Sequence, residues 1–345
     1  MRAPVRINLA LQGGGAHGAY TWGVLDRLLE EDWIEIAGIS GTSAGALNGA
    51  ALKAGLSAGG RTAARETLEW LWLQIGAVGD MRLAGWMSSA LPAAGPLTRM
   101  AEGYVALSPV DMMTRLFSPY AYGPLYRNPL ERVVRRFRFS EVCAETGPRL
   151  FISATNVRTG KIRVFSGGEI STEVILASAC LPTLFQAVEF EDPATGESEA
   201  FWDGGYSGNP ALFPLFDAAL PDDVVVVNIN PLRRDSVPTS PQDILNRINE
   251  ISFNSSLLRE LRSIAFVKEL IAGGRVERGV MKDVLLHMIA DDALMNDLSS
   301  GTKLVPSPIL LHRLKEAGRK AADLFLANHR DDLGRRSTVD LETLL

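Results

Sequence analysis

Two glycine-rich turns near the N-terminus constrain the fold more than any other feature of the sequence. An apolar run, residues 5–11, ends at three consecutive glycines, and residues 19–33 after them have helical spacing. A second apolar run, residues 34–40, meets the pentapeptide GTSAG, and residues 46–55 again have helical spacing. Strand, turn and helix repeated in this order form a βαβα unit, and such units build parallel sheets. The sequence therefore predicts an α/β protein.

Later segments add further strands and then helices. The additional predicted strands are residues 150–156, 162–165, 188–190 and 199–202. Residues 223–229 contain four consecutive valines, which is typical of a strand buried on both faces. Beyond Pro241 the pattern becomes helical, over residues 243–272, 281–295 and 309–328.

These elements divide the chain into three parts. They are an α/β domain over residues 1–235, a helical C-terminal region over residues 236–331 packed on it, and a disordered tail over residues 332–345. Within the first part, residues 80–126 lack clean periodicity and are rich in glycine, proline, methionine and aromatic residues. This stretch is either a lid or pocket insertion, or irregular packing over the edge of the sheet.

Composition excludes several classes of protein. The chain has 35 basic and 40 acidic residues, whereas a nucleic-acid binder normally carries a basic excess. Its two cysteines and four scattered histidines form neither a disulfide framework nor a metal-ligand spacing. No segment resembles a signal peptide or has the roughly 18 uninterrupted apolar residues of a membrane span. We expect a soluble, cytoplasmic protein that binds no metal or nucleic acid and contacts a membrane only peripherally.

The pentapeptide Gly41-Thr42-Ser43-Ala44-Gly45 fits the G-x-S-x-G pattern of a nucleophile elbow. Small flanking residues allow a sharp turn that projects the serine hydroxyl from the end of a strand. The following helix directs its N-terminal amides toward developing negative charge, so the Ala44 amide is a candidate oxyanion donor. The alternative is an ordinary strand-to-helix turn with a serine cap. Placement between a strand and a helix favours the elbow.

The first turn satisfies a different motif. Gly13, Gly15 and Gly18 match the dinucleotide fingerprint G-x-G-x-x-G. That motif needs an acidic residue about 20 positions later, at the end of the second strand, to bind a ribose. The nearby acidic residues lie instead in the preceding helix (Glu30, Glu31 and Asp32) or at the start of the strand (Glu35). A nucleotide-binding oxidoreductase is therefore the weaker alternative, because the same glycine amides can form an oxyanion cradle.

A serine hydrolase also needs a base. Asp203 follows a predicted strand and precedes two glycines, which by itself is an ordinary Asp-Gly turn. The downstream histidines (His287, His312 and His329) lie in sequence predicted to be helical. An aspartate held against the serine can accept its proton if partial burial raises the basicity of the carboxylate.

Taken together, these segments resemble the patatin-like phospholipase family, in its bacterial form, over roughly residues 5–230. The resemblance is carried by QGGGAHG, GTSAG and DGG, and by the segments ASACLPTLF and WDGGYSGNP that lead into and contain Asp203. It implies a three-layer α/β/α sandwich with a mainly parallel sheet, here followed by the helical C-terminal extension. It also implies a Ser43–Asp203 dyad without histidine, an oxyanion hole formed by Gly13, Gly14 and Gly15, and no cofactor.

The resemblance further implies hydrolysis of acyl esters in phospholipids or related lipids through an acyl-enzyme intermediate. Acyl transfer to another alcohol or thiol would use the same dyad, so it remains an alternative. We expect a lipid or acyl-ester substrate; the sequence leaves open a homo-oligomer and the need for an activating partner. Residues 80–126 then become candidates for the lid or acyl-chain pocket.

Two residues depart from the family pattern. Many members have an acidic residue where this chain has Gln12, and the position of His17 is commonly Arg or Lys. A neutral imidazole weakens any prediction of headgroup binding at that position.

The long C-terminal helix has two apolar faces. One contains Ile244, Ile248, Ile251 and Leu258, and the other contains Leu257, Leu261, Ile264 and Ile271. Either the helix docks on the core of the protein, or it offers a membrane-binding or dimerising surface.

Overall fold

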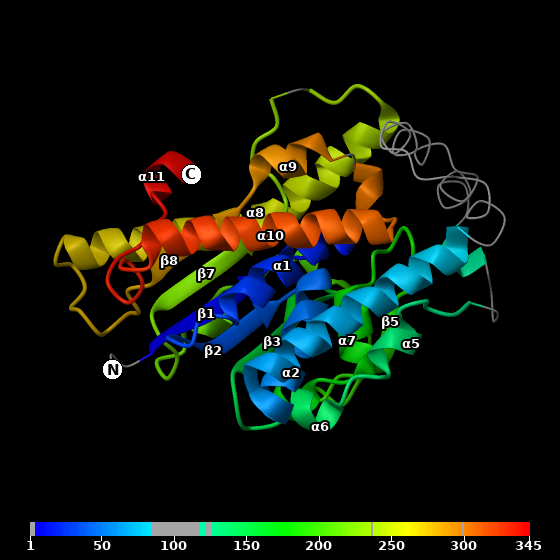
Figure 1. Ribbon diagram of the computed structural model, residues 1–345, viewed down its shortest axis with the longest axis horizontal. Coiled ribbons are helices and arrows are strands. Elements are labelled where there is room, and N and C mark those ends of the chain that lie inside the picture. The colour runs from blue at the N-terminus through cyan, green and yellow to red at the C-terminus, as the bar shows by residue number, and fades with distance from the viewer. Residues whose placement is uncertain (1–3, 84–117, 122–125, 236, 299) are drawn as a thin grey trace.

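A twisted, mainly parallel sheet forms the centre of the protein (Figure 1). The computed structural model describes residues 4–83, 118–121, 126–235, 237–298 and 300–345. The strands are β1 (Val5–Leu11), β2 (Ile34–Gly41), β3 (Arg149–Asn156), β4 (Ile162–Ser166), β5 (Val188–Glu191), β6 (Ser198–Asp203), β7 (Asp223–Asn228) and β8 (Leu285–Ala290). Their order is β5-β6-β3-β2-β1-β7-β8, with β4 paired to β3.

Five neighbouring strands (β3, β2, β1, β7 and β8) run parallel. The pairs β3–β4, β3–β6 and β5–β6 are antiparallel. Because β6 runs against β3, its last residue, Asp203, pairs with Ala154, two positions beyond the partner of Gly41 at the end of β2. The topology therefore brings the end of β6 to the carboxyl edge of the parallel strands, where α/β proteins place their ligand sites.

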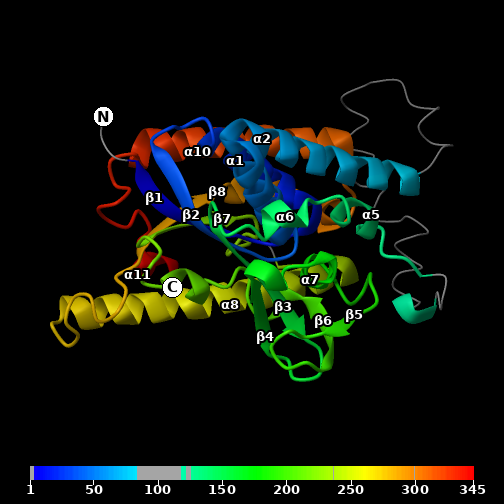
Figure 2. The same ribbon diagram turned by 90° about the horizontal axis from the view of Figure 1, so that it is seen from below.

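Helices cover both faces of this sheet. They are α1 (Gly18–Leu28), α2 (Ala44–Leu83), α5 (Glu131–Val134), α6 (Phe139–Val142), α7 (Thr172–Ser178), α8 (Pro241–Ala272), α9 (Asp292–Asp297), α10 (Pro308–His329) and α11 (Leu341–Leu344). In α2 the backbone breaks from helical geometry at Gly59 and Gly60, so it comprises two helices, and the first contains the helix predicted over residues 46–55. Figure 2 shows α1, α2 and α10 on one side of the sheet and α8 on the other. The expected three-layer α/β/α sandwich is confirmed.

The valines of β7 explain why both faces are covered. Val225 and Val227 pack in the core that contains α1, α2 and α10, whereas Val224 and Val226 pack in the core that contains α8. Successive side chains of a strand point to opposite faces. A strand with apolar residues at every position therefore needs a layer on each side.

The predicted helix over residues 281–295 is wrong. The segment contains β8, which pairs in parallel with β7 and ends the sheet, while only α9 near its end is helical. A short apolar run is ambiguous between buried helix and strand, and here the pairing with β7 decides. The helices predicted over residues 243–272 and 309–328 are present as α8 and α10. The C-terminal region thus supplies two of the covering helices, α8 and α10, and one strand of the sheet, β8.

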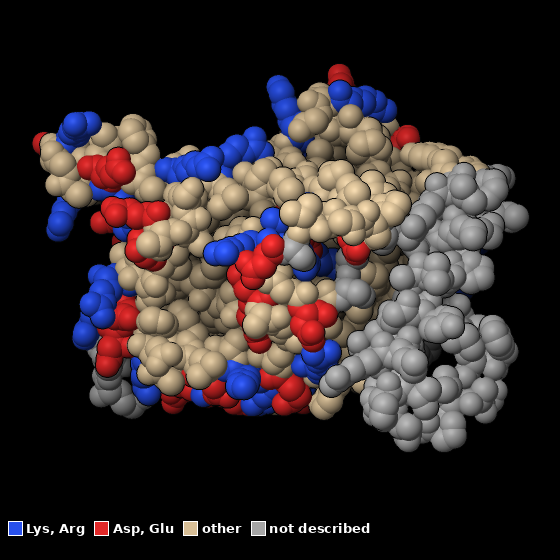
Figure 3. Space-filling view, turned by 90° about the horizontal axis from the view of Figure 1, so that it is seen from above, with Lys and Arg blue, Asp and Glu red and all other residues tan. Residues whose placement is uncertain are grey.

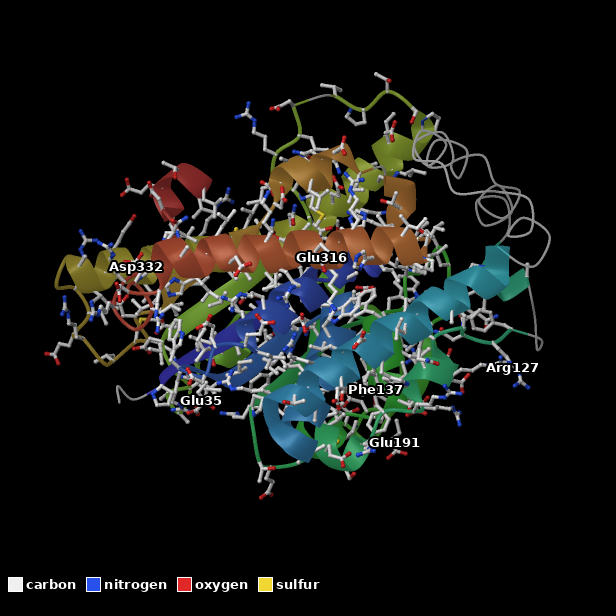
Figure 4. The ribbon with its side chains drawn as sticks, viewed as in Figure 1. Glu35, Arg127, Phe137, Glu191, Glu316 and Asp332 are labelled. Carbon is white, nitrogen blue, oxygen red and sulfur yellow. The ribbon has the colours of Figure 1, made fainter. Side chains whose placement is uncertain are left out.

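The expectation of a disordered tail over residues 332–345 is also corrected. The Leu286 amide donates to Ser337 Oγ, and the Leu286 carbonyl accepts from the Thr338 amide, both at 3.0 Å. Asp332, labelled in Figure 4 beyond α10, accepts hydrogen bonds from His329 and Arg336. Since β8 is an edge strand with backbone groups to satisfy, the tail docks against it.

In the part of the chain that the structure describes, no helix is both long and apolar enough to cross a membrane.

Candidate active site

Ser43 occupies a strained turn between β2 and α2. Its φ of 54° lies in the left-handed region, and no other non-glycine residue among those described has a positive φ. The turn is closed by a hydrogen bond of 2.7 Å from the Gly45 amide to the Thr42 carbonyl, and α2 begins at Ala44. Such strain persists only where surrounding structure imposes it, and it is a feature of nucleophile elbows. The predicted elbow is thus present.

Close backbone packing explains the glycines around Ser43. A Cβ atom on Gly45 would lie 2.0 Å from the Leu11 carbonyl oxygen, so only glycine lets the elbow rest on the end of β1. A Cβ atom on Gly13 would lie 2.6 Å from Ser43 Cβ. The first glycine turn therefore lies directly against the nucleophile candidate. This contact favours the oxyanion interpretation of the turn over dinucleotide binding.

Asp203 lies at the end of β6 and is fully buried. Its Oδ1 accepts a hydrogen bond of 2.8 Å from the Gly205 amide, while Oδ2 has no partner of ordinary hydrogen-bond geometry among the described residues. Burial raises the pKa of Asp203 to about 7, although the Gly205 amide and the nearby Ser43 hydroxyl act in the opposite direction. A carboxyl group with this pKa can both accept and return a proton near neutral pH.

The end of α7 and the residues just after it hold both members of the predicted dyad. The Ser43 amide donates to Ser178 Oγ at 2.9 Å, and the Asp203 amide donates to the Cys180 carbonyl at 2.8 Å. Gly204 adds a close contact, because a Cβ atom there would lie 3.0 Å from Thr42 Cγ2. The structure thus brings Ser43 and Asp203, 160 positions apart in the sequence, to one site.

The amides of the glycine turn are not equivalent. The Gly13 amide donates to Asn209 Oδ1 at 2.7 Å, so the prediction that it binds an oxyanion is corrected. The structure records no acceptor for the amides of Gly14, Gly15 and Ala44 among the described residues. These three amides remain the candidate oxyanion donors.

A buried polar network holds the glycine turn from behind. Gln12 Oε1 accepts from the amides of Ile229 and Asn230 at 2.9 and 3.1 Å, and from Asn230 Nδ2 at 3.2 Å. Gln12 Nε2 donates to the Asn209 carbonyl at 3.3 Å and to Asn254 Oδ1 at 3.4 Å. A carboxamide can accept and donate at once, whereas an ionised carboxylate can only accept. Gln12 in place of the acidic residue is therefore fitted to its surroundings.

Sequence reasoning missed the residues that support the elbow and the glycine turn. Asn209 and Ser178 lie in the segments WDGGYSGNP and ASACLPTLF, so a signal for them was present. Asn230, Asn254 and Lys303 come from later parts of the chain that carry no motif.

His17 is buried and neutral. Burial, with the charge of Lys303 next in importance, lowers the pKa of His17 to about 3. Its Nε2 lies 2.7 Å from Thr302 Oγ1. Gly15 contacts the same segment, since a Cβ atom there would lie 2.2 Å from the Lys303 carbonyl oxygen. His17 thus links the glycine turn to residues 302–303 and supplies no positive charge.

No histidine hydrogen-bonds to Ser43 or Asp203 within the described residues. His287 is buried on β8, where Nε2 lies 3.0 Å from Asp223 Oδ1 and Nδ1 lies 3.2 Å from Thr338 Oγ1. Asp223 is the first residue of β7. It therefore lies at the amino end of the parallel strands, whereas Ser43 lies beyond their carboxyl end. His312 and His329 lie on α10. The expectation that His287 lies in a helix is wrong, because it lies on this strand.

The predicted lid or acyl-chain pocket at residues 80–126 lies mostly outside the described residues. Of the described part, Tyr120 Oη accepts from the Ala187 amide at 3.1 Å, and the Pro119 carbonyl accepts from Gln186 Nε2 at 3.1 Å. Trp70 of α2, which precedes the stretch, and Phe137 (Figure 4), which follows it, pack edge-to-face.

The chain is similar to known proteins both in sequence family and in structure. A family model described as patatin-like phospholipase matches residues 9–216, a segment that contains Ser43, Asp203 and both glycine turns. Among solved structures, the chain is similar to VipD from Legionella pneumophila, with 13% identity and a TM-score of 0.43, covering 95% of this chain and 68% of that chain.

It is also similar to a chain of the heterodimeric ExoU-SpcU complex from the type III secretion system of Pseudomonas aeruginosa, with 17% identity and a TM-score of 0.28. That match covers 96% of this chain and 60% of the other. A search of the curated proteins found no match. The family assignment rests on the family model, which covers more than half of the chain.

Proposed function

The chain belongs to the patatin-like phospholipase family, and from this premise we propose that it is a serine acyl hydrolase that cleaves lipid esters with Ser43 and Asp203. One observation carries the proposal. Ser43 stands on a strained elbow beside a buried aspartate whose pKa is raised to about 7. A nucleophile next to a base of matched pKa is the arrangement that covalent acyl transfer requires.

The first half of the reaction forms an acyl-enzyme. Ser43 Oγ attacks the ester carbonyl carbon while its proton passes to Asp203 Oδ2, the carboxylate oxygen that has no partner of ordinary hydrogen-bond geometry among the described residues. The carbonyl oxygen becomes an oxyanion that accepts hydrogen bonds from the amides of Gly14, Gly15 and Ala44. When the carbon–oxygen bond of the ester breaks, the leaving alcohol takes the proton from Asp203.

The second half releases the acyl group. Asp203 accepts a proton from water, whose oxygen attacks the acyl-enzyme through a second oxyanion at the same amides. Collapse of that intermediate releases the carboxylic acid and returns the proton to Ser43. Asp203 is regenerated as a carboxylate, so the cycle needs no cofactor.

Contact with the lipid surface falls to the N-terminal half of α8 in this proposal. Leu257, Leu261 and Ile264 are buried, so this apolar face of the helix docks on the core as one alternative expected. The other face, with Ile244, Ile248 and Ile251, is 41–56% exposed. These isoleucines precede Phe253 on the same helix, and Phe253 packs on Tyr206 beside Asp203.

On the face shown in Figure 3, basic and acidic side chains lie intermixed. Charge on that face therefore does not mark a better surface for lipid contact than the apolar residues of α8. An apolar stripe beside the site fits a substrate that is itself part of a lipid assembly. The contact is peripheral in this proposal, and a cytoplasmic location remains a prediction.

Labelling with a fluorophosphonate tests the proposed function. The reagent should form an adduct on Ser43. As the Ser43 hydroxyl is modified, hydrolysis of p-nitrophenyl esters and phospholipids should be lost to the same extent. Ser43→Ala should abolish both labelling and hydrolysis. An adduct on another serine, with Ser43→Ala still active, would refute the assignment. If the protein hydrolyses short esters but neither phospholipids nor acylglycerols, the lipid substrate is refuted while Ser43 remains the nucleophile.

A further inference from the structure

The peptide between Gly13 and Gly14 is held by one strong hydrogen bond. Asn230 Nδ2 donates to the Gly13 carbonyl oxygen at 2.7 Å, and Asn209 Nδ2 adds a longer contact of 3.5 Å. In a trans peptide the carbonyl oxygen and the amide hydrogen point to opposite sides. The bond to Asn230 therefore fixes the direction of the Gly14 N–H, which points to the side of the turn away from Asn230.

The Asn230 carboxamide is itself fixed in one orientation. Its Oδ1 accepts from Lys303 Nζ at 3.0 Å, and its Nδ2 also donates to Gln12 Oε1 at 3.2 Å. An ammonium group only donates, so the oxygen of the carboxamide must face Lys303. The nitrogen must then face the Gly13 carbonyl. Lys303 thus determines which way Asn230 is turned.

A buried carboxylate holds Lys303 in place. Glu250 Oε1 lies 3.2 Å from Lys303 Nζ, and Arg234 binds both oxygens of the same carboxylate at 2.7 and 2.8 Å. Burial opposes ionisation, but the Arg234 hydrogen bonds and the charge of Lys303 hold the pKa of Glu250 at about 2. Glu250 therefore stays charged, and it retains Arg234 as a partner when Lys303 is replaced.

We propose that Asn230 and Lys303 are positioning residues that aim the Gly14 amide at the oxyanion. Both lie beyond residue 216, outside the segment that matches the family model. The C-terminal region then supplies part of the catalytic geometry in addition to packing. This inference rests on the proposed function for its effect on rate, but the orientation of the peptide can be tested separately.

Kinetics of Asn230→Ala, Lys303→Met and Lys303→Arg give the first test, on a soluble p-nitrophenyl ester. Misdirecting one oxyanion donor should lower kcat of Asn230→Ala by about 10²–10³-fold. KM should stay within about threefold, because the interaction forms only in the transition state. Lys303→Met should lose about tenfold, and Lys303→Arg should recover most of it, since both cations donate to Asn230. Affinity for a trifluoromethyl ketone, which forms a tetrahedral adduct on Ser43, should fall in parallel with kcat.

Two matched controls lie toward the amino ends of the parallel strands, away from Ser43. Asn8 is buried and its Nδ2 also donates to a backbone carbonyl, that of Pro221, at 2.7 Å. Lys282 Nζ donates to the carbonyls of Asp217 and Leu220. Asn8→Ala and Lys282→Met should leave kcat within about threefold of wild type, even where the melting temperature falls. Equal losses in these controls would mean that kcat follows stability, which would overturn the proposal.

A double mutant tests whether Lys303 acts through Asn230. Combining Lys303→Met with Asn230→Ala should lower kcat no further than Asn230→Ala alone, within about threefold. Multiplication of the two losses would show independent roles and overturn the pairing. A kcat of Asn230→Ala within about threefold of wild type would overturn the proposal as a whole.

Crystal structures separate this proposal from the proposed function. In Asn230→Ala the Gly13–Gly14 peptide should rotate from its wild-type orientation, whatever reaction the protein catalyses. An unrotated peptide would refute the positioning role. If the wild-type protein hydrolyses no ester, the proposed function fails while the orientation of this peptide still decides the structural claim.

Discussion

The amide of Ser43 donates a hydrogen bond of 2.9 Å to the Oγ of Ser178, the last residue of α7. Two residues later the Cys180 carbonyl accepts from the Asp203 amide. One short segment therefore sets the backbone of both the proposed nucleophile and the proposed base, and the Ser43 amide is already used in this structural hydrogen bond. This explains how residues so far apart in the sequence keep a fixed relative position.

Ser178→Ala tests this relationship. Without the hydroxyl, the buried Ser43 amide loses its acceptor, and the strained elbow loses one of its constraints. We expect kcat on a soluble ester to fall by about tenfold or more, with KM little changed. Ser153→Ala is the matched control, because Ser153 Oγ is buried without a hydrogen-bond partner among the described residues. Equal activity in the two variants would contradict the role of Ser178.

The pH dependence of the wild-type enzyme follows from Asp203. Only the carboxylate can accept the Ser43 proton, and burial raises the pKa of this group to about 7. The value of kcat/KM should therefore rise with pH through an inflection near 7, falling about tenfold per unit below it. An inflection near 4 would show that Asp203 is exposed to water in solution or is not the base.

Histidine substitutions should leave the chemistry intact. His287 lies between the Thr338 hydroxyl and the Asp223 carboxylate. This cluster is at the amino end of the parallel strands, away from Ser43. His287→Gln should lower the melting temperature, because a buried hydrogen-bonded pair is disturbed, and should keep kcat within about threefold. A loss of several hundredfold at His287, His312 or His329 in a folded variant would indicate a Ser–His–Asp triad instead.

The exposed stripe of α8 should control binding to lipid. Replacing Ile248 and Ile251 with serine removes two exposed apolar side chains, so binding to phosphatidylcholine vesicles should weaken by about tenfold or more. Hydrolysis of a soluble ester should be unchanged, because neither residue touches the site. Phe266→Ser, at the other end of α8 and 59% exposed, is the control and should bind vesicles normally. Unchanged binding by the double variant would remove this surface from the account.

Local motifs predicted the turn at Ser43 and most of the strands. GTSAG predicted Ser43 on a turn because the small residues permit a backbone that larger ones exclude. The role of Asp203 came from resemblance, since DGG alone is an ordinary turn. The valines of β7 predicted a buried strand because every position is apolar.

Long-range contacts set the limits of the sequence prediction. Gln12 and Asn230 meet across 218 positions, and nothing near either residue signals the other. Leu285–Ala290 became a strand because β7 offered it a parallel edge. The Gly13 amide was expected to bind an oxyanion, and only the fold shows that Asn209 accepts its hydrogen bond.

Asp203→Asn also tests the raised pKa through stability. A pKa of about 7 in the folded state, above the ordinary 3.8, means that ionising Asp203 disfavours folding. The stability associated with the protonated group is fully present below about pH 4 and is lost as the pH rises through about 7. The introduced asparagine cannot ionise, so the variant should gain melting temperature relative to wild type between about pH 5 and pH 8. This gain makes unfolding an implausible cause of any loss in rate.

The kcat of Asp203→Asn at about pH 8 is the most direct test of the Ser43–Asp203 dyad. Asparagine keeps the shape of the side chain and can accept the Gly205 amide, but it cannot take the Ser43 proton. The account predicts a folded enzyme whose kcat on a soluble ester is lower by about 10²–10⁴-fold, with KM little changed. A kcat within about threefold of wild type would show that Asp203 is only a turn residue, and would contradict the dyad.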